Sequence, residues 1–212
     1  MIALITGASR GLGFALGRAL ASKYHVVAVA RTVGALEELD DSIQAKGGNA
    51  TLVPLDLTDA EGVSRMCAAI FERWGGIDLW LHTAAHATSL SPAHHIAADD
   101  IATTIQVHVH ATSDLISKVD PLLRARNGTA VFMQDDQLDK KFFGSYAAGK
   151  AAEAALFRAW AAETIKSGPT VLGFSPNPMP TGTRARFFPG EDKSALYGCA
   201  NEAQRLISEH GL

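Results

Sequence analysis

The stretch Thr6-Gly7-Ala8-Ser9-Arg10-Gly11-Leu12-Gly13 lies between a short apolar run and a segment with helical spacing. Glycine has no Cβ, so the glycines at 7, 11 and 13 allow a tight turn and a close approach of an anion to the backbone. The start of a helix then offers free N–H groups and the positive end of the helix dipole. Because the glycines follow a strand and open a helix, the pattern predicts the pyrophosphate-binding turn of a dinucleotide site. A structural turn that binds nothing is the alternative.

Strand and helix patterns alternate along the rest of the chain. Short apolar runs predict strands, and apolar residues at helical spacing predict helices. The expected strands are Ile2–Thr6, His25–Ala30, Thr51–Leu55, Ile77–His82, Thr129–Met133 and Thr170–Phe174. The expected helices are Gly11–Lys23, Val33–Lys46, Thr58–Trp74, Asp99–Arg124, Gly144–Lys166 and Glu202–His210.

Three local patterns add detail to these elements. Thr58 and Glu61 have the spacing of a capping box at a helix start. Pro121 predicts an interruption in the long helix that ends at Arg124. The proline-rich stretch Pro176–Pro189 is expected to lack regular structure.

Repeated β-α units imply right-handed crossovers and a mainly parallel sheet. The strand runs are almost continuously apolar, which is typical of strands buried on both faces. A length of 212 residues fits one α/β domain. The sequence therefore predicts a single Rossmann-like, doubly wound domain over residues 1–212, with about six strands in the order 3-2-1-4-5-6.

The composition indicates which partners and which cellular compartment to expect. The net charge of -3 gives no basic excess for nucleic acid or an anionic membrane. Two distant cysteines, Cys67 and Cys199, favour a reducing compartment over a disulfide framework. The first residues already have a strand pattern, and no apolar run is long enough to span a bilayer, so a cytoplasmic protein without a signal peptide is expected.

Later landmarks follow the glycine turn in a consistent order. Asp56-Leu57 comes after the third strand, Tyr146-Ala147-Ala148-Gly149-Lys150 opens a helix, and Ser175-Pro176 and then Thr181 follow the sixth strand. With TGxxxGxG in the turn and YxxxK at Tyr146, the chain resembles the short-chain dehydrogenase/reductase (SDR) family over nearly its whole length. Within that family it resembles a short member that lacks the seventh strand and has an altered active site.

The resemblance implies a nicotinamide dinucleotide cofactor. The family places adenine contacts at Asp56 and Leu57 and nicotinamide contacts around Pro176 and Thr181. The residues expected to contact the cofactor are Gly7, Ser9, Arg10, Gly11, Leu12, Gly13, Arg31, Thr32, Asp56, Leu57, Thr83, Ala84, Tyr146, Lys150, Pro176 and Thr181.

The end of the second strand indicates which cofactor is bound. NAD-selective relatives carry an acidic residue there, whereas this chain has Ala30 followed by Arg31. Arg10 lies in the glycine turn, and two guanidinium groups can bind a 2′-phosphate through charge-assisted hydrogen bonds. The pattern favours NADP(H), and solvated surface arginines are the alternative.

Tyr146 and Lys150 are spaced i, i+4, so they share one helix face. An ammonium group near a phenol lowers the phenol's pKa. The resemblance implies that Tyr146 exchanges a proton with the oxygen of a carbonyl or alcohol substrate, while Lys150 also holds the nicotinamide ribose. The expected activity is hydride transfer by an oxidoreductase, and an exposed helical Tyr and Lys are the alternative.

The sequence departs from the family where substrate would bind. The run Phe132–Asp136 lacks the usual serine, so Gln134 could donate its amide N–H to a carbonyl, and Asp135 could donate only when protonated. His108 replaces the usual asparagine, and His82 begins the segment His82-Thr83-Ala84-Ala85 that replaces NNAG. The candidate catalytic residues are Tyr146, Lys150, Gln134, Asp135 and His108. A non-catalytic NADP(H)-binding protein, or a subunit with a role only in assembly, is the alternative.

Six of the eight histidines gather in the short segment from residue 82 to residue 110: His82, His86, His94, His95, His108 and His110. His108 and His110 would point in different directions on a helix, and no HExxH or paired-cysteine spacing accompanies them, so no metal site is expected. The small residues Ala151, Ala152, Ala154 and Ala155 favour close helix packing, and a homodimer (or a tetramer) through the two long helices is predicted.

Overall fold

The computed structural model describes residues 1–135 and 139–212, and a parallel sheet forms its centre. Within this part of the chain the strands are β1 (Ile2–Thr6), β2 (His25–Ala30), β3 (Ala50–Pro54), β4 (Leu79–His82), β5 (Thr129–Met133) and β6 (Thr170–Phe174). They lie in the order β3-β2-β1-β4-β5-β6, and every neighbouring pair is parallel. The predicted strand order is therefore confirmed. The order reverses between β1 and β4, which is where such folds bind ligands.

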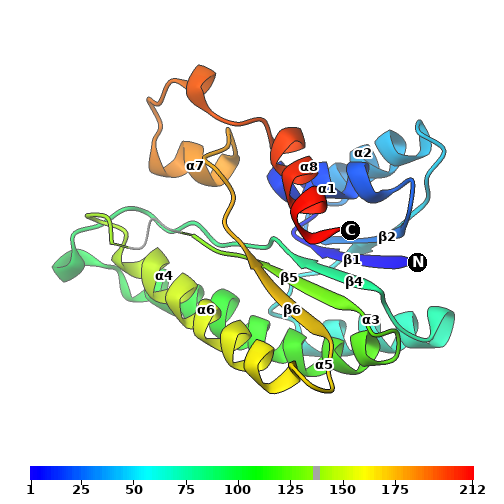
Figure 1. The fold of residues 1–212 in the computed structure, drawn as a ribbon. Coiled ribbons are helices and arrows are strands. Elements are labelled where there is room, and N and C mark those ends of the chain that lie inside the picture. Colours follow the sequence, from blue (N-terminus) through cyan, green and yellow to red (C-terminus); the bar gives the residue numbers. More distant parts are fainter. Residues whose placement is uncertain (136–138) are drawn as a thin grey trace.

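Helices cover both faces of the sheet (Figure 1). They are α1 (Gly11–Leu20), α2 (Val33–Gln44), α3 (Ala60–Trp74), α4 (Ala98–Ile105), α5 (Thr112–Arg124), α6 (Gly144–Thr164), α7 (Gly182–Phe187) and α8 (Cys199–His210), with short 3-10 turns at Ala93–His95 and Lys193–Ala195. In Figure 1, α1, α2 and α8 lie on one face and α3, α4, α5 and α6 on the other. The doubly wound arrangement is thus confirmed.

Two apolar clusters, one on each face of the sheet, explain the continuously apolar strands. The side chains of Leu4 and Ile5 point to opposite faces because the strand period is two. Ile5 is buried in one cluster with Leu16 of α1, and Leu4 is buried in the other with Trp80 and Phe132. Burial on both faces leaves no polar face for a strand to display.

The start of α3 differs from the prediction. Asp59 is the N-cap, and its carboxylate accepts a hydrogen bond from the Gly62 N–H at 2.9 Å. The Thr58 hydroxyl instead donates to Asp56 at 2.8 Å. The predicted capping box of Thr58 and Glu61 is wrong because Thr58 turns back toward the end of β3, and the next carboxylate fills the cap.

The interruption predicted at Pro121 lies elsewhere. Pro121 sits inside α5, which continues to Arg124. One missing N–H leaves a single carbonyl without its helical donor, and α5 accommodates that loss. The irregular part is the π-helical segment Gln106–Ala111 between α4 and α5. Such wide turns occur often at functional sites.

The proline-rich stretch also contains a helix that the sequence reading missed. α7 is six residues long, and the Thr181 hydroxyl accepts a hydrogen bond from the Arg184 N–H at 3.2 Å as its cap. Pro180 and Pro189 flank this helix rather than interrupt it. α7 and the segment that leads to α8 lie beyond the carboxyl ends of the strands (Figure 1).

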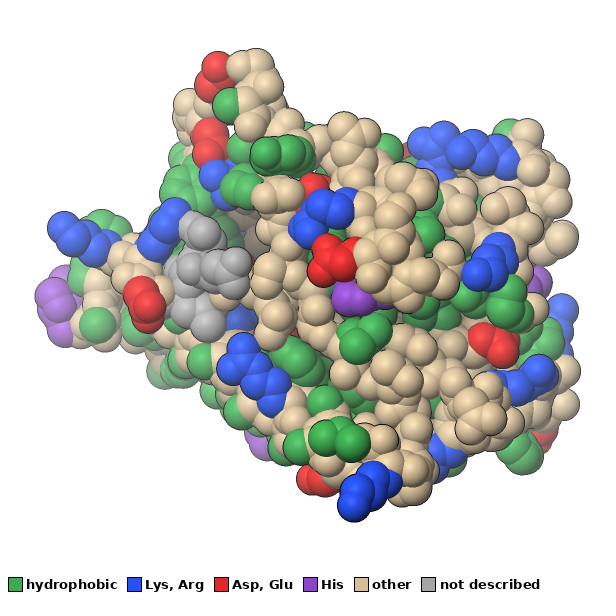
Figure 2. Space-filling view, in the orientation of Figure 1, with side chains coloured by type: hydrophobic (Ala, Val, Ile, Leu, Met, Phe, Trp, Pro, Cys, Tyr) green, Lys and Arg blue, Asp and Glu red, His purple; other side chains and the backbone are tan. Residues whose placement is uncertain are grey.

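The distribution of charged side chains on the surface agrees with the lack of a basic excess in the composition. On the face drawn in Figure 2, basic and acidic side chains are interspersed with apolar ones. Among the helices of residues 1–135 and 139–212, none is long and apolar enough to cross a membrane.

Candidate active site

A groove runs along the carboxyl ends of the strands, across the β1–β4 switch point. Its wall includes most of the residues predicted to contact a cofactor: Gly7, Ser9, Arg10, Gly11, Leu12, Gly13, Arg31, Asp56, Leu57, Thr83, Ala84, Pro176 and Thr181. The groove is also lined by apolar residues that were not predicted from the sequence: Val29, Leu55, Val107, Met133 and Met179. Of the predicted contacts, Thr32, Tyr146 and Lys150 lie outside this wall as the described residues form it.

The glycines of the turn have packing reasons as well as conformational ones. Gly7 has φ +89°, and a Cβ there would lie 2.6 Å from the backbone nitrogen of Ala84. A Cβ on Gly13 would lie 2.3 Å from the carbonyl oxygen of Gly7. Gly11 has φ +59°, a backbone conformation that favours glycine. The Thr83 hydroxyl donates to the carbonyl oxygen of Thr6 at 2.9 Å, so β4 holds the turn in place.

One end of the groove carries the arginines. Ala30 ends β2 where an acidic residue would select NAD, and Arg31 projects beside it with most of its side chain exposed. A guanidinium nitrogen of Arg31 lies 3.6 Å from the Asp56 carboxylate. Partial burial opposes ionisation of Asp56, but hydrogen bonds from Thr58 and the charge of Arg31 outweigh it and lower the pKa of Asp56. Arg10 is exposed on the same groove.

The other end of the groove is fixed by α8. The backbone N–H and side-chain amide of Asn177 donate to Glu202 at 2.8 and 2.9 Å. Arg205 donates to the Ser175 carbonyl at 2.7 Å and pairs with Glu202. The buried carboxylate of Glu202 therefore holds the loop that follows β6 in place. The sequence reading missed Glu202, although its spacing of i, i+3 from Arg205 on a helix was visible.

Tyr146 lies in an apolar cluster with Phe143 and Phe187. Its ring centroid is 4.9 Å from that of Phe187 in α7, and its hydroxyl donates to Asp135 at 2.9 Å. Burial, followed by the nearby Asp135 carboxylate, raises the pKa of Tyr146 far above the usual value of a phenol. The sequence reading expected the opposite direction, from Lys150. In the structure, burial of the phenol and then the carboxylates of Asp135 and Glu153 act in the other direction.

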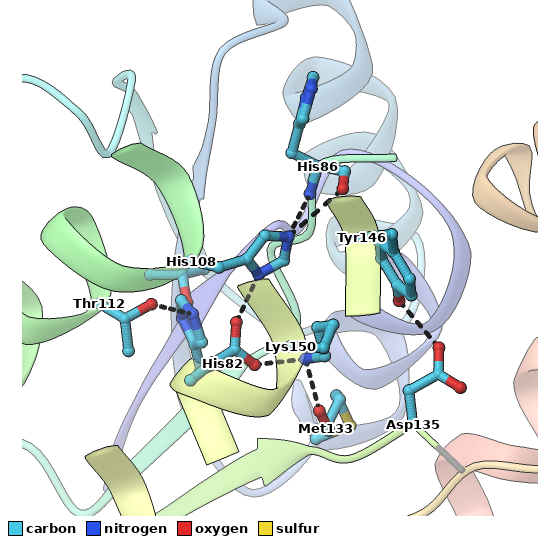
Figure 3. Close-up of polar contacts among 10 residues, drawn as sticks. His82, His86, His108, Thr112, Met133, Asp135, Tyr146 and Lys150 are labelled. Carbon is cyan, nitrogen blue, oxygen red and sulfur yellow. Dashed lines mark hydrogen bonds and ion pairs between the residues drawn. The ribbon is translucent and has the colours of Figure 1, made fainter. Parts of the chain in front are cut away.

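Lys150 sits in a buried polar network (Figure 3). Its ammonium donates to the carbonyl oxygen of Met133 at 2.7 Å and forms an ion pair with Glu153, one turn along α6. Burial opposes ionisation of Glu153, but the charge of Lys150 and a hydrogen bond from His108 outweigh it and lower the pKa of Glu153 to about 2. Glu153 is 1% exposed and was not predicted as a site residue.

His108 links Glu153 to the loop after β4. Its Nδ1 is 2.6 Å from a Glu153 carboxylate oxygen, and because a carboxylate only accepts, Nδ1 carries the proton. Nε2 accepts from the His86 N–H at 3.1 Å and also lies 3.3 Å from the His86 carbonyl oxygen. His108 comes from the π-helical segment and its ring centroid is 6.0 Å from that of Tyr146. The predicted proximity of His108 to the site is therefore found, through a partner that the sequence did not reveal.

The other predicted groups lie farther from the groove. Gln134 packs its amide against Gly173 of β6 and lines a small separate cavity with Lys150 and Glu153. Asp136, the end of the run that lacks a serine, lies outside the described residues. The ring of His82 is in the core, with Nδ1 2.8 Å from the Thr6 hydroxyl, and burial lowers the pKa of His82 to about 4. Among the described residues, no group of three or more His, Cys, Asp or Glu side chains could hold a metal ion.

Comparison with known proteins gives a consistent picture. A family model described as short chain dehydrogenase matches residues 1–192. The chain is 31% identical over 172 residues to a fatty acyl-CoA reductase of Acinetobacter baylyi, a match that covers 78% of this chain and 58% of that protein. The chain spans about half the length of the curated relatives that it matches.

Solved structures share the fold. A short chain dehydrogenase from Pseudomonas syringae superposes with a TM-score of 0.91 at 26% identity, over 97% of this chain and 87% of that one. A Shigella flexneri short chain dehydrogenase complexed with NADP superposes with a TM-score of 0.86 at 25% identity, over 94% and 86% of the two chains. With the family model matched over residues 1–192 and this fold and groove in place, the chain belongs to the short-chain dehydrogenase/reductase family of oxidoreductases.

Proposed function

We propose that the protein is an NADP(H)-dependent oxidoreductase that transfers a hydride between the nicotinamide and a carbonyl or alcohol substrate. One observation carries this proposal: the groove that begins at the arginines continues past the glycine turn to Met133, whose carbonyl oxygen accepts a hydrogen bond from Lys150. A single cleft thus runs from the two arginines to a residue that contacts the lysine of the YxxxK motif.

The residues of the groove fit an NADP(H) molecule. The glycine turn and the first N–H groups of α1 would hold the pyrophosphate. Arg31 and Arg10 would hold the 2′-phosphate, and the absence of a carboxylate side chain at Ala30 removes the repulsion that would oppose it. Asp56 and Leu57 would contact the adenine end, and Thr83, Ala84, Pro176 and Thr181 the nicotinamide end. The bound cofactor supplies or accepts the hydride. The Shigella flexneri relative in complex with NADP supports this choice.

Tyr146 would donate its proton to the substrate oxygen during reduction. Its hydroxyl now donates to Asp135, so this hydrogen bond must turn toward the substrate. Phe187 covers the ring, so α7 must also move to admit a substrate. Lys150 and Asp135 would orient the phenol, and His108 would act through Glu153. Whether Gln134 takes over part of the missing serine's role depends on its leaving Gly173.

Cofactor choice is tested by calorimetry with NADPH and NADH. NADPH should bind at least about tenfold more tightly, because the 2′-phosphate gains charge-assisted hydrogen bonds. Ala30→Asp should reverse this preference, since the new carboxylate repels the phosphate. Equal affinity for the two nucleotides in the wild type would rule out the proposed selectivity.

Chemistry is tested with a panel of aldehydes, ketones and hydroxy acids. Tyr146→Phe and Lys150→Ala should each abolish turnover while NADPH binding by Tyr146→Phe persists. Turnover that survives Tyr146→Phe would show that the proton comes from elsewhere.

A non-catalytic NADP(H)-binding role is the second candidate, and the buried Tyr146, tied to Asp135 under Phe187, favours it. NADPH binding without turnover on any panel member would support it. A subunit that binds neither nucleotide would instead have a role in assembly. A homodimer or tetramer through α4–α5 and α6 remains a prediction, for which sedimentation is the measurement.

A further inference from the structure

The ammonium of Lys150 does not face Tyr146 as a lone positive charge. It is paired with Glu153, which is also buried and belongs to the same helix. The second carboxylate oxygen of Glu153 accepts the Nδ1–H of His108, which is itself fully buried. Both carboxylate oxygens therefore have fixed partners, and Glu153 cannot swing away from Lys150 without breaking a buried hydrogen bond.

We propose that Glu153, held by His108, is a positioning residue that cancels the charge of Lys150 and keeps Tyr146 protonated, so that the site favours reduction of a carbonyl over oxidation of an alcohol. The direction of the reaction rests on the proposed function, whereas the effect on Tyr146 concerns this chain alone. In reduction, the Tyr146 O–H bond breaks and its proton goes to the substrate oxygen, while the hydride from NADPH goes to the carbonyl carbon.

The charges around the phenol support this assignment. Asp135 acts on it from the end of β5 and Glu153 from α6, where Glu153 is paired with Lys150, and the ring centroid of His108 lies 6.0 Å from that of Tyr146. The one ammonium and the two carboxylates of this group sum to a net negative charge. A phenolate would add another negative charge to a buried site, where Coulomb energies are large. The neutral phenol is therefore the stable form, and a neutral phenol is a proton donor.

His108 completes the arrangement because both of its ring nitrogens are occupied. The backbone N–H of His86 donates to Nε2 at 3.1 Å, and Nδ1 donates to Glu153 at 2.6 Å. The imidazole is thus fixed at both nitrogens, and it holds Glu153 in place.

The test uses NMR of the protein labelled with ¹³C at tyrosine Cζ, without cofactor or substrate. The chain has three tyrosines, and Tyr146→Phe identifies the signal of interest. In the wild type, the Tyr146 signal should titrate only at a pH well above the pKa of a free phenol. In Glu153→Gln the midpoint should fall by at least about one pH unit, a tenfold loss of proton affinity. Glu153→Asp should restore a high midpoint.

Glu163→Gln is the matched control, because Glu163 lies on the same helix with an exposed side chain. It should leave the Tyr146 midpoint unchanged. A wild-type midpoint at or below that of free tyrosine would overturn the proposal, whichever variants fold. A Glu153→Gln protein that is folded by circular dichroism and has an unmoved midpoint would do the same.

A second readout separates this idea from the proposed function. If carbonyl reduction is found, the alkaline limb of its pH profile should move to lower pH in Glu153→Gln and stay in place in Glu163→Gln. A fixed limb in Glu153→Gln would contradict the proposal. Absence of turnover on every substrate would reject the proposed function while the tyrosine titration still decides the role of Glu153.

Discussion

At the scale of single residues, the absence of a Cβ at Gly13 allows the glycine turn to close. A Cβ there would overlap the carbonyl oxygen of Gly7, which follows β1, and the hydroxyl of Thr83, which follows β4. Neither atom can move aside easily. The oxygen of Gly7 belongs to the backbone, and the hydroxyl of Thr83 is held by its hydrogen bond to β1. Close packing, not only a turn conformation, therefore requires glycine at this position.

Gly13→Ala should lower the free energy of unfolding by about 1–3 kcal/mol, as overpacking does in other cores, and weaken NADPH binding. Chemical denaturation and calorimetry measure the two effects. Gly34→Ala is the control, because no atom lies within 4 Å of a Cβ there and alanine favours a helix. An alanine at 13 that is as stable as the wild type would show that the turn relaxes freely.

At the scale of elements, α8 fixes the loop that follows β6. Glu202 is 2% exposed and holds two N–H groups of Asn177, while Arg205 holds the carbonyl of Ser175. These contacts join segments about 25 to 30 residues apart in the chain. The end of the groove at Pro176 therefore depends on a helix that is not part of the groove wall.

Glu202→Ala should free this loop, because two partly buried donors lose their acceptor at a cost of about 1–3 kcal/mol. Hydrogen exchange at the backbone amide of Asn177 should accelerate, and NADPH affinity should fall. Glu209→Gln removes only an exposed pair with Arg205 and should change neither quantity. Unchanged exchange in Glu202→Ala would mean that the loop is held by other contacts.

At the scale of the whole molecule, buried titratable groups make stability depend on pH. His82 is fully buried and its pKa falls to about 4 in the folded state, from about 6.5 in an unfolded chain. Between these values the unfolded state binds more protons, so the free energy of unfolding decreases as the pH is lowered. Glu153 adds a similar loss at lower pH, between its ordinary carboxyl range and about 2.

The contribution of His82 should reach a slope of up to about 1.4 kcal/mol per pH unit between about pH 6.5 and 4. His82→Asn, which keeps a polar side chain beside Thr6 without a titrating ring, should flatten the curve in this window. Urea unfolding at a series of pH values measures both curves. Parallel curves for wild type and variant would exclude His82 as the source.

Much of the architecture followed from local patterns. The strand order, the glycine turn and the position of the groove were predictable because the periodicity of apolar residues, which distinguishes strands from helices, is visible among neighbouring residues. Predictions from the sequence were wrong where a neighbouring residue competed for the same role or where a pattern had a second interpretation. Asp59 displaced Thr58 at the cap of α3, and α7 formed between two prolines that bound it without entering it.

The sequence by itself determined the fold, the family and the place of the YxxxK motif, because these depend on periodicity and on spacing within one element. Only the tertiary structure decided what Tyr146 and Lys150 face. His108 and Glu153 are 45 residues apart and meet because a π-helical segment and α6 pack together. The ionisation of the phenol depends on burial and on charges gathered from α6 and the end of β5, and no single stretch of the chain contains them all.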